Sequence, residues 1–125
     1  CTDGTGFGLL GHALEMAEAS GVGIVVAKSA VPVLPRGREL AEAGAIPGGT
    51  KNNFRHVENR VDFPDALDQI DRWILCDAVT SGGLLMSAAP EHADSLLSAL
   101  RDAGVDAHRI GTVTDKHPGR ILVTE

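Results

Sequence analysis

The first twelve residues, CTDGTGFGLLGH, contain the residue types and spacings best suited to chemistry. Gly6, Gly8 and Gly11 follow the G-x-G-x-x-G pattern, in which glycines let backbone amides approach an anion at the start of a helix. The dinucleotide-binding form of this pattern follows a strand and needs an acid about 20 residues further on, and neither condition is met here. Two interpretations remain open: contact with a phosphate, or close helix packing through Gly8 and Gly11.

Asp3 lies just before this glycine run and has two candidate roles. As a helix cap, its carboxylate would accept backbone N–H groups of the first turn and would be stabilised by the helix dipole. As a Mg²⁺ ligand, it would act beside phosphate oxygens, because Mg²⁺ is commonly held by one or two carboxylates together with the substrate. The residues alone favour the cap.

A second glycine-containing segment, TSGG at residues 80–83, offers two hydroxyls and two flexible backbone positions. It is either a nest for a phosphate or a tight turn before a strand, and the turn is the favoured interpretation. GGT at 48–50, followed by Lys51, Asn52 and Asn53, leaves the same choice between anion donors and turn formers.

Histidine and cysteine give weaker signals. None of the five histidines fits a zinc-binding spacing, and His12 is predicted to be solvated on the helix face opposite most of the leucines. Cys76 lies in an apolar run and is predicted to be a buried, unreactive side chain. No Ser-His-Asp elbow or paired-carboxylate motif is present.

Composition limits the partners that the chain can have. Its 125 residues are 43% apolar and 22% charged, which predicts one compact domain, residues 1–125, with a real core. The net charge of −6 argues against nucleic acid and anionic membranes, so a bound phosphate would need backbone amides or metal ions. Two cysteines without a disulfide pattern indicate a reducing, cytoplasmic compartment. Because the chain has no initial Met and its glycine motif comes at once, we expect a fragment lacking its N-terminal half.

The elements that must position these residues follow from apolar periodicity, which predicts a mixed α/β domain with about four strands. Residues 47–61 are rich in turn formers and are predicted to be a long loop. Residues 108–114 and 120–124 are predicted to form a hairpin around DKHPG. The other predicted elements are helices at 5–20, 37–43, 65–75 and from Pro90 to Gly104, and strands at 22–28 and 84–89.

Taken together, these segments resemble a known family. CTDGTGFGLLGHALEMAEASGV, a later PGGTKNN, DAVTSGGLL and a closing IGTV are similar to the C-terminal domain of the selenophosphate synthetases (selenide, water dikinases). That family belongs to the PurM-like superfamily, with aminoimidazole ribonucleotide (AIR) synthetase and thiamine-monophosphate kinase. The resemblance covers nearly the whole chain and implies a three-layer α/β/α domain that is partly ferredoxin-like.

The resemblance also implies an activity. The whole enzyme makes selenophosphate, AMP and orthophosphate from selenide, ATP and water, using Mg²⁺. Asp3 matches the family's metal-ligating Asp, so the resemblance favours the ligand over the cap. The implied phosphate contacts are Thr5, Gly6, Phe7, Gly8, Thr80, Ser81, Gly82 and Gly83.

The same resemblance limits what this chain does by itself. The catalytic nucleophile and most of the ATP site are implied to lie in an absent N-terminal domain, through which the protein forms a homodimer. No catalytic residue is expected in this chain, and the isolated chain is expected to be inactive.

Two departures from the family pattern bear on the rigidity of the site. Gly4 stands where the family usually has Val, and DAVTSGG stands where DPQTSGG is usual, so Ala78 lacks the fixed φ of proline. Two other functions remain open. One is a sister enzyme of the superfamily that uses ATP, and the other is a non-catalytic binding module that has kept the fold.

Overall fold

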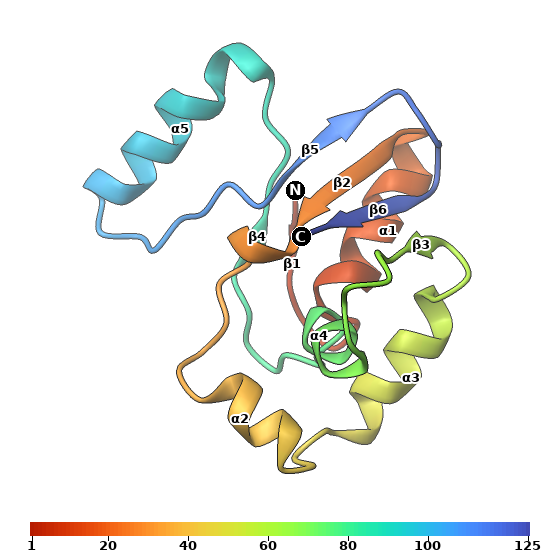
Figure 1. Ribbon diagram of the computed structural model, residues 1–125. Coiled ribbons are helices and arrows are strands. Elements are labelled where there is room, and N and C mark those ends of the chain that lie inside the picture. The colour runs from red at the N-terminus through yellow and green to blue at the C-terminus, as the bar shows by residue number, and fades with distance from the viewer.

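A mixed four-stranded sheet forms the centre of the computed structural model, which describes residues 1–125 (Figure 1). The strand order is β3-β6-β2-β5. β6 runs parallel to both β2 and β3, whereas β5 is antiparallel to β2. The strands are β2 (Gly23–Ala27), β3 (Val61–Asp62), β5 (Gly111–Thr114) and β6 (Ile121–Thr124). The predicted mixed α/β class and four-stranded sheet are confirmed.

The predicted hairpin between the last two strands is wrong, because β2 lies between β5 and β6. Residues 115–120 pass across the end of β2, where the Gly119 amide donates to the Val22 carbonyl at 2.9 Å. The physical reason is the apolar character of β2, GIVVA, which favours a central position with a neighbouring strand on each side.

Helix α1 (Gly8–Ser20) packs its apolar stripe on one face of this sheet, and its buried residues include Leu10, Ala13, Leu14 and Ala17. They meet Val26, Ile121 and Val123 from the strands in one core cluster. Gly21 ends the helix in the left-handed conformation, φ 64°, as the sequence predicts. The predicted start at Thr5 is wrong: the helix begins at Gly8 and Phe7 occupies the N-cap position.

Helix α3 (Gly48–Val57) replaces the loop predicted for residues 47–61. Only Thr50 and Val57 of this helix are buried, so it shows almost no apolar stripe. The turn-forming residues in its first half have no helical periodicity, so the sequence did not predict this helix. Contacts with the rest of the chain stabilise it.

The remaining helices lie around this core. α2 (Gly37–Glu42) and α4 (Gln69–Leu75) lie with α3 in the lower part of Figure 1. The short 3₁₀ helix η1 (Lys28–Ala30) directly follows β2. α4 begins at Gln69, four residues later than predicted, and the carboxylate of its N-cap residue Asp68 accepts the Asp71 amide at 2.9 Å. That hydrogen bond, and then Arg38, lower the pKa of Asp68. α2 is joined to α4 through Arg38, which contacts both Asp68 and Asp71.

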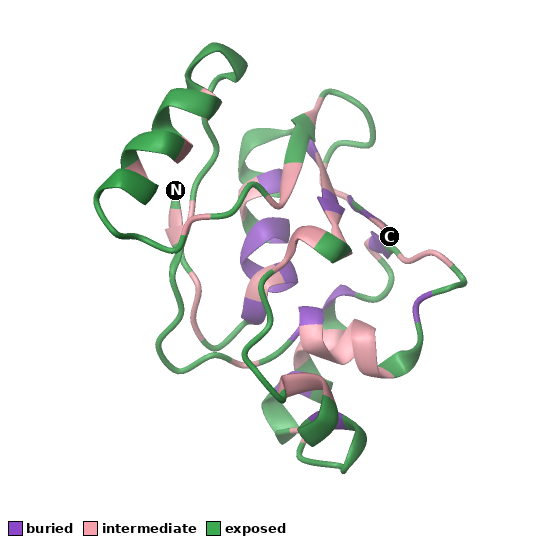
Figure 2. Cartoon of the chain, turned by 60° about the vertical axis from the view of Figure 1, so that its left-hand side comes forward, coloured by how far each residue is buried: buried purple, intermediate pink, exposed green.

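Helix α5 (Pro90–Asp102) has the predicted bounds but buries none of its residues. In Figure 1 it stands apart from the sheet, and in Figure 2 it is mostly exposed, with only short partly buried stretches. The predicted strand at 84–89 is shortened to β4 (Leu84–Leu85), which pairs with β1 (Thr2–Asp3) in a separate two-stranded sheet. No helix is long and apolar enough to cross a membrane.

Cys76 is fully buried in the core, as predicted, whereas Cys1 is exposed. Burial raises the pKa of the Cys76 thiol to about 12, so it stays protonated at neutral and mildly alkaline pH. We expect a disulfide reagent at pH 8 to modify Cys1 alone in the native chain and both thiols after denaturation in urea. Rapid modification of both thiols without urea would contradict this placement.

Candidate functional site

The two glycine segments singled out from the sequence lie side by side. β1 pairs with β4 in antiparallel register, with Asp3 opposite Leu84. Beyond this pair, the Gly4 amide donates to the Gly83 carbonyl at 2.8 Å, and the Gly82 amide donates to the Gly4 carbonyl at 3.0 Å. The backbone therefore joins the DGTGFG and TSGG segments directly, although they are far apart in the sequence.

The glycines of these segments divide into two kinds. A Cβ added to Gly8 would lie 2.6 Å from the Asp77 carbonyl oxygen, and one added to Gly82 would overlap the Gly4 carbonyl. A Cβ added to Gly6 or Gly83 would meet no atom within 4 Å. Gly8 and Gly82 are thus needed for close packing of the chain, whereas Gly6 and Gly83 face open space.

Asp3 extends from β1 as an exposed residue. It does not cap α1, because the N-cap position is Phe7 and no side chain caps that end. No group of three or more His, Cys, Asp or Glu residues gathers anywhere in the chain to hold a metal ion. A cation at Asp3 would therefore need further ligands from a substrate or from another part of the protein. This fits Mg²⁺, which is often held by one or two carboxylates plus phosphate oxygens.

His12 is buried and not solvated, which corrects the prediction from the sequence. Its Nε2 lies 3.1 Å from both the backbone N and the Oγ1 of Thr5, and its Nδ1 lies 3.1 Å from Glu15 Oε2. Because α1 starts at Gly8, the preceding turn folds back over the first helical turn and covers the imidazole. Helical periodicity gives the face on which His12 lies but not the turn before Gly8 that covers this face, so the prediction of a solvated side chain was wrong.

Helix α3 supplies two further residues that the sequence did not assign to the site. Asn53 Nδ2 lies 2.8 Å from the Gly6 carbonyl oxygen and 3.1 Å from that of Cys76, and donates to both. Thr50 Oγ1 donates to Asp77 Oδ1 at 2.7 Å and accepts the Ala78 amide at 3.2 Å. These side chains therefore connect the glycine turn to residues 76–78, and their polar atoms are directed at the protein itself.

We expect the change Asn53→Leu to lower the free energy of unfolding by about 1–3 kcal/mol, because two carbonyl groups lose their donor. The matched control is Asn52→Leu, since Asn52 is exposed and contacts only Arg55 on its own helix. The measurement is chemical denaturation of the two variants and the parent protein. Equal loss in the two variants would contradict the bridging role of Asn53.

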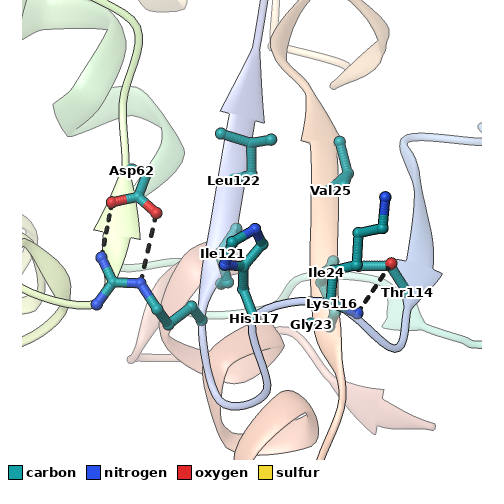
Figure 3. A pocket seen from close by; sticks show the side chains of 10 residues that line it. Gly23, Ile24, Val25, Asp62, Thr114, Lys116, His117, Ile121 and Leu122 are labelled. Atoms are coloured by element: carbon teal, nitrogen blue, oxygen red, sulfur yellow. Dashed lines mark hydrogen bonds and ion pairs between the residues drawn. The ribbon is translucent and has the colours of Figure 1, made fainter.

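Two hollows elsewhere on the surface contain none of the sequence-predicted site residues. The one in Figure 3 measures about 170 Å³ and lies at one end of the sheet, between the Asp62–Arg120 ion pair and Lys116. The other, about 410 Å³, lies between α3 and α4, where Lys51 Nζ is 5.3 Å from the centre of the Trp73 ring. Asp3 lies in neither of these two hollows and is exposed at the surface.

Comparison with known proteins finds relatives along almost the whole chain. The family described as AIR synthase related protein, C-terminal domain, matches residues 1–124. A protein from Myxococcus xanthus named selenide, water dikinase is 46% identical over 118 residues, which are 94% of this chain and 34% of that protein. A protein of the same name from Pelobacter propionicus is 43% identical over 124 residues, 98% of this chain and 36% of its own length. The chain therefore spans about a third of the length of these curated relatives.

Proposed function

Because the chain belongs to the AIR synthase related family, whose C-terminal domain it matches from residue 1 to residue 124, we propose that it is the C-terminal domain of a selenide, water dikinase. In this proposal the full-length protein converts selenide, ATP and water to selenophosphate, AMP and orthophosphate. The identity of 46% and 43% to proteins with that name supports the assignment over other members of the family.

The observation that carries the proposal is the meeting of the two glycine segments beside Asp3. The Gly4–Gly83 and Gly82–Gly4 hydrogen bonds put one carboxylate and two turns on the same surface. Several backbone N–H groups of these turns make no hydrogen bond within the chain and remain available to phosphate oxygens. They belong to Gly6, Phe7, Thr80, Ser81 and Gly83.

The remaining residues assigned from the sequence contribute differently. The amides of Gly8 and Gly82 donate to the carbonyls of Thr5 and Gly4, so these two glycines support the turns instead of contacting phosphate through their N–H groups. Thr5 gives its amide to His12. We propose that phosphate contact falls to the residues with open amides, together with the hydroxyls of Thr80 and Ser81.

Mg²⁺ would be held by Asp3 and by ligands outside this chain, and it would supply positive charge that offsets the charge of the ATP phosphates. A cation is needed there because the chain carries a net charge of −6 and would otherwise repel the nucleotide. Asp3 keeps its carboxylate exposed and so available to a metal. We propose further that an N-terminal domain covers this surface and excludes bulk water, and that the full protein is a cytoplasmic homodimer.

The test is phosphorus NMR of the full-length protein with Mg·ATP, with and without selenide. We expect AMP, orthophosphate and a selenophosphate signal that appear only when selenide is present. ADP as the sole nucleotide product would instead favour a sister enzyme of the family. Absence of turnover in the folded full-length protein would favour a binding module. The isolated chain is expected to bind Mg·ATP weakly and to give no product in the same assay.

A further inference from the structure

We infer that His12 is a positioning residue for the proposed site. It fixes the orientation of Thr5, so that the Thr5 hydroxyl oxygen coordinates a cation at Asp3 or accepts a hydrogen bond from water bound to that cation. The inference rests on the proposed function, because it assumes that Mg²⁺ and a phosphate ligand bind at this surface. The observation behind it is the chain of contacts from Thr5 through His12 to Glu15.

The first step concerns the protons on the imidazole. A backbone amide can only donate, so the Thr5 N–H makes Nε2 of His12 an acceptor, at 3.1 Å. A neutral imidazole with an unprotonated Nε2 carries its proton on Nδ1, and Glu15 Oε2, 3.1 Å away, accepts it. The carboxylate of Glu15 thereby fixes both the orientation and the tautomer of the ring.

The second step concerns the Thr5 hydroxyl. Its Oγ1 also lies 3.1 Å from Nε2, and Nε2 has no proton to give. The hydroxyl can then interact with Nε2 only as a donor, and it would share the single lone pair of that nitrogen with the backbone amide of the same residue. Its proton is then directed into the protein, and only the lone pairs of Oγ1 remain for a ligand. Such an oxygen attracts a cation or metal-bound water and offers nothing to a phosphate oxygen.

The third step places this oxygen near Asp3. Gly4 separates Asp3 from Thr5, and both backbone polar groups of Gly4 are bonded to residues 82–83. Residues two apart in a chain have Cα atoms within about 7 Å of each other, so Thr5 lies beside Asp3 just beyond the end of β1. The only side-chain hydrogen bonds of Thr5 go to a histidine that is 8% exposed, so its direction is fixed from inside the protein. The structure thus assigns Thr5 to the cation and not to the phosphate contacts expected from the sequence.

The experiment uses the full-length protein, with Mn²⁺ in place of Mg²⁺ and a non-hydrolysable ATP analogue. We would measure the Kd of Mn²⁺ by electron paramagnetic resonance and the hydrogen exchange of the Thr5 amide. His12→Leu removes the acceptor, whereas His12→Gln keeps an acceptor oxygen within reach. The same change to Leu at His92, an exposed residue of α5, is the matched control.

We expect His12→Leu to raise the Kd of Mn²⁺ roughly tenfold, the usual range for a residue that orients a metal ligand, and to speed exchange of the Thr5 amide. His12→Gln should stay within about threefold of the parent on the same scale, and His92→Leu should match the parent. Faster exchange with an unchanged Kd would overturn the inference, because His12 would then serve the fold alone. Unchanged exchange would overturn it as well.

A second variant keeps the test decisive if His12→Leu does not fold. Thr5→Val removes the hydroxyl but leaves the backbone amide bonded to His12, so we expect weaker Mn²⁺ binding with unchanged amide exchange. Equal Mn²⁺ affinity in Thr5→Val and the parent would overturn the inference. A parent protein that binds Mn²⁺ and the analogue but makes no AMP would contradict the proposed function, while these affinity comparisons would still decide the role of His12 and Thr5.

Discussion

Replacing Asp3 by Asn in the full-length protein is expected to lower Mg²⁺-dependent formation of AMP by at least about 100-fold, which is the loss expected when a metal that stabilises transferring phosphates loses its ligand. The folded protein should survive the change. Asp3 is exposed and caps no helix, so its carboxylate supports no part of the fold that we can identify. The measurement is the initial rate of AMP release across a range of Mg²⁺ concentrations, together with the melting temperature.

The matched control for this prediction is Asp65→Asn, which removes the same charge from another exposed position. It should leave both the rate and the Mg²⁺ dependence unchanged. If Asp3→Asn keeps full activity, the site at β1 is not a metal site, and a non-catalytic binding module becomes the better interpretation of this chain. If activity is lost together with folding, Asp3 has a structural role that its exposure does not reveal.

The change Gly8→Ala is expected to lower the free energy of unfolding by about 2–5 kcal/mol. The backbone of Gly8 has φ 70°, which costs an L residue about 1–2 kcal/mol. The new methyl group would also lie 2.6–2.7 Å from backbone atoms of Cys76 and Asp77, and such overpacking costs a further 1–3 kcal/mol or so. Chemical denaturation of the parent and variant proteins measures the difference.

Gly6→Ala is the control for this second prediction, because it makes the same change two residues away, in the same motif. A Cβ at Gly6 meets no atom within 4 Å, so stability should fall by well under half as much. The pair also separates the two interpretations of the glycine pattern, since Gly8 should affect stability and Gly6 should affect ligand binding. Comparable destabilisation by both variants would show that the turn is packed differently from the structure described above.

Local sequence signals predicted those elements whose stabilisation is itself local. The apolar stripe of residues 90–102, with Pro90 at its start, gives the bounds of α5 correctly. The left-handed Gly21 marks the end of α1 in the same way. Mixed α/β architecture likewise follows from the alternation of helical and apolar β-branched segments.

The elements that were predicted wrongly depend on partners distant in the chain. α3 is stabilised by hydrogen bonds from Thr50 and Asn53 to residues 76–78 and to Gly6. Apolar periodicity along the sequence does not indicate such contacts. The true start of α1 depends on the fold-back of Thr5 onto His12, which a pattern counted along one helix does not reveal. The predicted hairpin had suitable turn residues, but it competed with β2, which offers a more apolar partner to both strands.

The candidate site shows the same division. Asp3 and the TSGG segment were predicted as site residues from residue types and from the resemblance; the structure shows that they lie side by side, and their roles stay a prediction. His12 was predicted to be solvated, and Thr50 and Asn53 were left open between anion donors and turn formers. Each contributes through a hydrogen bond to a residue far away or across a turn, so its role becomes visible only in three dimensions.

The position of β2 between β5 and β6 has a consequence for synthesis of the protein. Both neighbours of this strand lie far along the sequence, with β5 beginning 84 residues after the end of β2 (111 − 27), so an emerging chain presents the apolar segment GIVVA without either partner until residues 111–124 are made. A ribosome that stops short of Gly111 would release a product that cannot form its sheet and that exposes a segment prone to β-aggregation. Residues 111–124 therefore decide whether a released chain can bury β2 in its sheet or is left open to aggregation and degradation.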